Sequence, residues 1–173
     1  MENYFYSNEI AEHIKFLLDE NLPKEAAKNI TVGDFTVLPD PDTYTEYLPA
    51  VIISTNEMAV NSANLSRRIF HTPYNYTIYY LFPYTFEPGT EPVKQCQKNA
   101  EAIANILIND HTLDGFEIDK TYDEAGGMVV ISEMSRIRYD NAEQAFFREL
   151  RLPVSVASIN FSVDFRTFDK EAY

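Results

Sequence analysis

The stretch HTPYNYTIYYLFPYTFEP, residues 71–88, decides how this sequence folds. It contains five tyrosines and two phenylalanines in a chain without tryptophan. A base-stacking platform, a sugar-binding strip or a strand covered by protein on both faces would each explain this density. Base-stacking platforms combine aromatic residues with Lys and Arg, but no lysine lies between residues 29 and 93. The stretch therefore predicts a half-buried strand that contributes to the core and to an interface.

The composition indicates one compact domain across residues 1–173. A chain of 173 residues with 45% hydrophobic content can bury a single core, and only residues 166–173 are expected to form a flexible tail. The formal net charge of -13 opposes binding to phosphate backbones and anionic lipids. The one cysteine, Cys96, excludes an internal disulfide and predicts a small buried residue in a reducing compartment. We expect a soluble protein without a membrane segment, because no apolar run reaches the length of a span.

Two amphipathic helices are predicted. The first begins near Ser7, a plausible N-cap, and its apolar residues recur at helical spacing: Ile10, Ile14, Leu17 and Leu18. Pro23 interrupts this helix, and residues 24–30 are read as a further turn or two. The second helix begins near Pro92, with a stripe that packs on the sheet: Val93, Cys96, Ala100, Ile103 and Leu107.

The remaining apolar segments predict strands. Residues 48–55, LPAVIIST, form a continuous apolar run that is typical of a strand covered on both faces. Residues 56–66 read as a loop or extended hairpin tip. The other predicted strands are residues 35–38 at an edge, 68–82 with a bulge near Pro73, 115–122 and 128–139 joined by the turn DEAGG, and 148–165. In the last of these the alternation slips between Val156 and Ile159, which predicts a second bulge.

This order of elements predicts an α+β fold. Helix, strands, helix and strands follow one another with hairpin-like connections. We therefore expect a mainly antiparallel β-sheet with the N-terminal helix and the second helix packed on one face.

The residues that would indicate catalysis are scattered. Glu9 and His13 share a helix face and could offer two metal ligands, but no His-Glu-x-x-His pattern occurs. His71 and His111 lie elsewhere in the chain. The carboxylates of residues 110–124 do not have the spacing of a calcium loop, and no Gly-x-Ser-x-Gly motif is present. We predict no catalytic residue, no metal site and no cofactor.

Arginines gather within the predicted strands. Arg136 and Arg138 are two residues apart, which places both on one face of a strand. Other pairs are Arg67 with Arg68 and Arg148 with Arg151. In an acidic chain these groups form either cross-strand ion pairs within the subunit or an oligomer interface with acidic loops of a neighbour. The sequence favours neither.

The element order, with the phrases LPAVIIS, RRIFHTPYNYTIYYLF, PVKQCQKNAEAIANILIND, GMVVISEMSRIRYD and LRLPVSVASINFSVDF, resembles tail terminator (tail completion) proteins of tailed bacteriophages. The resemblance covers roughly residues 10–165. It implies a non-enzymatic structural virion protein of the phage neck, made in the host cytoplasm. Such proteins form a homo-oligomeric, hexameric ring that caps the tail tube and joins it to the head connector or adaptor protein. The acidic charge suits a lumen through which DNA passes without specific binding. The acidic, proline-rich residues 39–49 depart from the family.

The resemblance and the arginine clusters suggest where contacts form. Partner contacts are expected at Arg67, Arg68 and the loop of residues 56–66, including Asn61 and Asn64, and subunit contacts at Arg136 and Arg138. The strand residues Tyr76 and Tyr80 are also interface candidates. Two alternatives remain: a tail tube or other head-tail joining subunit, and a small-molecule or glycan-binding domain that uses Tyr76, Tyr80 and the carboxylates of residues 119–124.

Overall fold

The computed structural model describes residues 6–34, 43–56, 62–64, 69–83, 88–110, 126–136 and 154–168. Within these residues three helices and six strands occur. In chain order they are α1 (Ser7–Asn21), β1 (Asn29–Val32), α2 (Tyr44–Tyr47), β2 (Ala50–Thr55), β3 (Ser62–Asn64), β4 (Ile69–Pro83), α3 (Pro92–Asn109), β5 (Gly126–Arg136) and β6 (Val154–Phe168).

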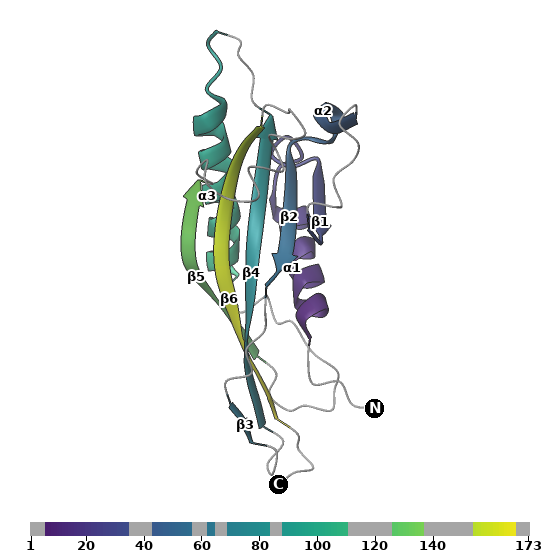
Figure 1. Ribbon diagram of the computed structural model, residues 1–173, viewed down its shortest axis with the longest axis vertical. Coiled ribbons are helices and arrows are strands. Elements are labelled where there is room, and N and C mark those ends of the chain that lie inside the picture. Colours follow the sequence, from purple (N-terminus) through teal and green to yellow (C-terminus); the bar gives the residue numbers. More distant parts are fainter. Residues whose placement is uncertain are drawn as a thin grey trace.

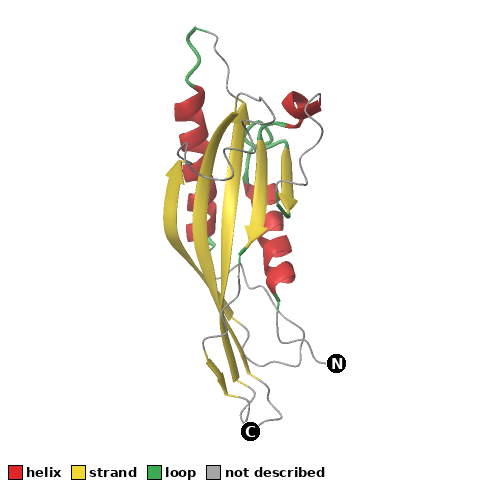
Figure 2. Cartoon of the chain, in the orientation of Figure 1, coloured by secondary structure: helices red, strands yellow, loops and turns green. Residues whose placement is uncertain are grey.

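The strands form one sheet in the order β1-β2-β4-β6-β5, with β3 paired to β4 outside this path. Only the β1–β2 pair is parallel among the described strands, and the others are antiparallel. Both long helices lie on the same face, α1 over β1 and β2 and α3 over β4, β6 and β5 (Figures 1 and 2). The predicted α+β fold is therefore confirmed.

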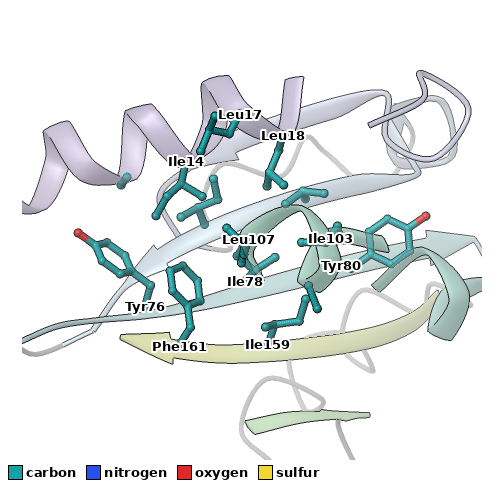
Figure 3. Packing of buried hydrophobic residues seen from close by; sticks show 14 of the residues in the cluster. Ile14, Leu17, Leu18, Tyr76, Ile78, Tyr80, Ile103, Leu107, Ile159 and Phe161 are labelled. Carbon is teal, nitrogen blue, oxygen red and sulfur yellow. The ribbon is translucent and has the colours of Figure 1, made fainter. Parts of the chain in front are cut away.

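The core lies between the helices and this face of the sheet. The sequence pattern places apolar residues of α1 and α3 on their inner sides, where they meet the aromatic and aliphatic side chains of β4 and β6 (Figure 3). Cys96 is part of this cluster and is 3% exposed, as its position in the helical stripe predicts. The helix α1 begins at Ser7, and the residue at its N-cap is Tyr6 and not Ser7.

Strand β2 is an interior strand, as its apolar run predicts. It pairs with β1 on one side and with β4 on the other. Val51 and Ile53 join the core beneath the helices, whereas Ala50 and Ile52 join a second cluster on the opposite face with Leu48. Because both sets are buried, the strand shows no alternation of polar and apolar residues.

The expected bulge near Pro73 is absent. Strand β4 pairs with β6 without a register shift from Ile69 to Pro83, and Pro73 is opposite Asp164. On the other side of β4, Pro73 lies between the segments that pair with β3 and with β2, so no described strand is opposite it there. Proline has no backbone N–H group to donate, so it is tolerated where no neighbouring strand needs that hydrogen bond.

The second expected bulge, between Val156 and Ile159, is also absent. Strand β6 keeps one register with β4 throughout. The alternation slips because both faces are apolar: Ala157 and Ile159 belong to the core under the helices, whereas Val156 packs against the second cluster. A register irregularity occurs instead in the pairing of β5 with β6, on the β5 side between Ile131 and Glu133.

Three further expectations change. Asn29 and Ile30, read as the end of a further helical turn, begin β1. Gly126 and Gly127, read as a turn, are the first residues of β5 and pair with Arg166 and Phe165. Strand β6 continues to Phe168, so the first three residues of the expected tail are paired. The strands predicted at residues 35–38 and 115–122 lie outside the described residues.

Candidate subunit interface

The tyrosines of β4 were the first candidates for an interface. Tyr76 and Tyr80 lie on the face of β4 beneath the helices, and each is 0% exposed. The hydroxyl group of Tyr76 donates a hydrogen bond to the backbone carbonyl of Ser7 over 2.8 Å. The hydroxyl group of Tyr80 donates to the carbonyl of Ala26 and accepts from the side-chain amide of Asn99, both over 2.7 Å.

These hydrogen bonds correct the prediction that Tyr76 and Tyr80 contact a neighbouring subunit. A buried tyrosine needs a partner for its hydroxyl group, and here the chain itself supplies it, at the start of α1 for Tyr76 and in the turn that follows α1 for Tyr80. Tyr76 also stacks on Phe161 of β6, with ring centroids 5.4 Å apart. The two tyrosines therefore hold α1 on the sheet and are closed to a bound glycan or a second chain.

Burial changes the acidity of both tyrosines. Removal from water raises the pKa of Tyr76 and of Tyr80 well above the ordinary value of 10.0, because the charged phenolate is the form that loses hydration. The hydrogen bond that Tyr80 accepts from Asn99 opposes this shift only in part.

Stability is expected to fall as the pH rises above 10, the ordinary tyrosine pKa. In this range the folded chain keeps the protons of Tyr76 and Tyr80 whereas the unfolded chain releases them, so each unit of pH favours unfolding. Urea titrations between neutral pH and pH above 10 measure the effect, and ultraviolet absorbance reports phenolate formation. A Tyr76→Phe, Tyr80→Phe variant should show a shallower dependence. Ionisation of both tyrosines in the folded chain near pH 10 would contradict the assignment.

The opposite face of the sheet carries a row of polar side chains. Asn56 donates to the Thr77 hydroxyl group over 2.9 Å, and Thr77 donates to the side-chain oxygen of Asn160 over 2.7 Å. The row links the end of β2 to β4 and β6. Thr77 is 5% exposed, so its hydroxyl group is a buried cross-strand link and not an open binding group.

Half of the predicted contact residues lie outside the described residues: Asn61, Arg67, Arg68 and Arg138. Asn64 ends β3 and is opposite Ile69, which fits the expected hairpin tip. Arg136 ends β5 and is opposite Ala157. The structure therefore does not bring these residues together into one described surface, and their roles stay predictions.

An exposed surface that the sequence reasoning missed lies on the outer side of α1. Phe16 is 56% exposed there, and the neighbouring turns present four exposed carboxylates: Glu9, Glu12, Asp19 and Glu20. The only basic residue of α1, Lys15, is half-buried. The signal was available, because Phe16 falls outside the apolar stripe of the helix.

The outer side of α3 has a different character. Ile108 is 56% exposed, and with Phe16 it makes up the large exposed hydrophobic residues among those described. Lys94 and Lys98 are exposed in the first half of α3. Lys94 pairs with Glu91 over 2.6 Å, whereas no ion pair or hydrogen bond of Lys98 occurs among the described residues.

Other kinds of site find little support in the described part of the chain. No group of three His, Cys, Asp or Glu side chains that could hold a metal ion occurs there. The carboxylates of residues 119–124, proposed for glycan binding, lie outside it. No helix within the described ranges is long and apolar enough to cross a membrane.

Comparison with known proteins gives one coarse likeness. No protein-family model matches the chain, and no curated protein matches it. Among solved structures, the fold is similar to the sheath/tube terminator of an extracellular contractile injection system, PVC, in its extended state, with a TM-score of 0.45 and 15% sequence identity. The match covers 95% of this chain and 57% of that chain. This chain thus spans little more than half the length of that protein, and the likeness is one of coarse fold.

Proposed function

We propose that this protein is a non-enzymatic structural subunit of a phage-like tail, which forms a closed ring that caps the tail tube. The ring, hexameric in the related phage family, joins the tube to the head connector or adaptor and lets DNA pass through its lumen. The resemblance of the sequence to tail terminator proteins supports this proposal, and the order of helices and strands agrees with that resemblance.

The observation that carries the proposal is the part of the sheet that extends past the helices. Residues 69–73 of β4 pair with residues 164–168 of β6, and β3 pairs with β4 beside them. In Figure 1 this arm projects beyond the lower ends of α1 and α3. Residues 126–128 of β5 pair with residues 164–166 of β6 on its other edge, and a part of a sheet that no described helix covers gains stability when another layer packs on it. An assembly in which a neighbouring subunit covers the arm gives it a function and a source of stability.

The buried tyrosines also favour a structural role over ligand binding. The hydroxyl groups of Tyr76 and Tyr80 are bonded within the chain, so these two tyrosines offer no open hydroxyl group to a glycan. Strand β4 instead packs under the helices in the core and continues beyond them into the arm.

Negative-stain images of the purified protein, alone and with tail tubes, test the proposal. We expect closed rings, and rings seated at tube ends when tubes are present. Open filaments of this protein alone would contradict the capping role and favour a tail tube or other joining subunit. A monomer that is stabilised against heat by a glycan would favour the binding alternative.

A further inference from the structure

We infer that neighbouring copies in the ring join their sheets edge to edge, with β1 of one copy paired antiparallel to residues 134–136 of β5 in the next copy. This inference rests on the proposed function and names the strands that would join its subunits. The occupant of each sheet edge is therefore a second copy of this chain, and backbone hydrogen bonds form the contact.

The first argument is that the sheet has two unpaired edges in the described part of the chain. Strands β1 and β5 are the two ends of the strand order, and they lie at opposite margins of the sheet in Figure 1. Strand β1 pairs only with β2, and β5 only with β6, among the described strands. The backbone N–H and C=O groups of an unpaired edge are a template for a further strand.

The second argument is that β1 lacks the features that protect an edge strand from pairing. Such strands commonly carry lysine, proline or a bulge. The sequence of β1, NITV, has no charged residue and no proline, and its register with β2 is regular. Strand β5 does have an irregularity, between Ile131 and Glu133, but its register is regular from Glu133 to Arg136. The regular end of β5 thus has the length that the short strand β1 can pair with.

The third argument is strand direction. Strand β1 is parallel to β2, and each later step across the sheet, from β2 to β4, β6 and β5, is antiparallel. Strands β1 and β5 therefore run in opposite directions. Copies set side by side in the same orientation would place β1 of one beside β5 of the next as antiparallel neighbours. Because the two edges differ, the contact is heterologous, which is the kind that closes into a ring.

The fourth argument is height along the strands. One row of paired residues crosses the whole sheet: Thr31, Ile52, Tyr79, Ser158 and Ser135. By the same register, the row that begins at Ile30 ends at Arg136, and the row that begins at Val32 ends at Met134. The two edge segments are therefore level, and neighbouring copies need only the small stagger that a closed sheet requires. Arg136, predicted from the sequence as a subunit contact, lies on the joining strand.

Disulfide cross-linking provides the test. Three double variants cover the level register and a stagger of two residues in either direction: Thr31→Cys with Ser135→Cys, Ile30→Cys with Met134→Cys, and Val32→Cys with Arg136→Cys. Within one copy β1 and β5 are four strand spacings apart, about 19 Å, which is too far for a disulfide. A link therefore joins two copies.

We expect mild oxidation of the assembled protein to link at least one of these pairs. Electrophoresis without reducing agent should then show a ladder of covalent oligomers that ends at the number of subunits measured by sedimentation. Reducing agent should return all of the protein to the 19.9 kDa chain.

The controls separate the possible outcomes. Thr31→Cys with Glu101→Cys places the second thiol on an exposed position of α3, away from the predicted contact, and should form no ladder. Single-cysteine variants check that the buried Cys96 does not link, and circular dichroism checks folding. Rings that give no ladder with any of the three pairs, or a control pair that links equally well, would overturn this contact while the ring itself stands. A wild-type chain that remains monomeric at every concentration would overturn both this contact and the proposed function.

Discussion

Phe161→Ala is expected to lower the free energy of unfolding by about 3–5 kcal/mol, the usual cost of removing a buried aromatic ring. Phe161 is 2% exposed and stacks on Tyr76 at an interplanar angle of 20°. The two residues are opposite each other on β6 and β4. The substitution therefore leaves a cavity where the central strands meet the first turn of α1.

Urea unfolding followed by circular dichroism measures this loss. Phe16→Ala is the matched control, because it removes the same ring from an exposed position and should change stability by no more than about 0.5 kcal/mol. A loss below about 1 kcal/mol for Phe161→Ala would show that Phe161 is not in the core.

Tyr80→Phe is expected to cost about 2–4 kcal/mol, although it removes only one oxygen atom. The change leaves the carbonyl of Ala26 and the side-chain amide of Asn99 without their bonds to the hydroxyl group. Each buried polar group left unsatisfied costs about 1–3 kcal/mol. Asn99 keeps its other hydrogen bond, which it accepts from Gln95 over 3.0 Å.

A double-mutant cycle isolates the bond between Tyr80 and Asn99. The variants are Tyr80→Phe, Asn99→Ala and the pair, compared by urea unfolding. Because the two side chains are in direct contact, we expect a coupling energy of about 0.5–3 kcal/mol. Strictly additive losses would contradict the proposed pairing of the hydroxyl group with the amide.

The longer elements could be predicted from the sequence because their apolar residues recur over several turns or pairs. The stripe of α1, with Ile10, Ile14 and Leu17, gives the buried side of that helix. The run of β2 gives a strand buried on both faces. The strand β1 has only four residues, too few for a period to emerge, and its parallel pairing depends on β2.

The misplaced bulge in β6 has a related cause. Val156 and Ile159 are both apolar but pack in different clusters on opposite faces of the sheet. A sequence pattern reveals a slip in alternation but not a second core. Only the register with β4 distinguishes a strand with two apolar faces from a bulged one.

The role of the tyrosines could be predicted only in part. Alternation along β4 correctly places Tyr76 and Tyr80 on one face. The partners of their hydroxyl groups include the backbone carbonyls of Ser7 and Ala26. Any residue type offers such a carbonyl, so the sequence gives no sign of these bonds. The assignment of Tyr76 and Tyr80 to an interface was therefore wrong, because the partners of their hydroxyl groups depend on the tertiary fold and not on the local sequence.

The mass of the purified protein in solution tests the central claim most directly. Analytical ultracentrifugation over a range of concentrations should detect one closed species at a fixed whole-number multiple of the 19.9 kDa chain, six times that mass for a hexamer. A protein that stays at 19.9 kDa throughout, or one whose mass grows without limit as concentration rises, would contradict a ring-forming cap.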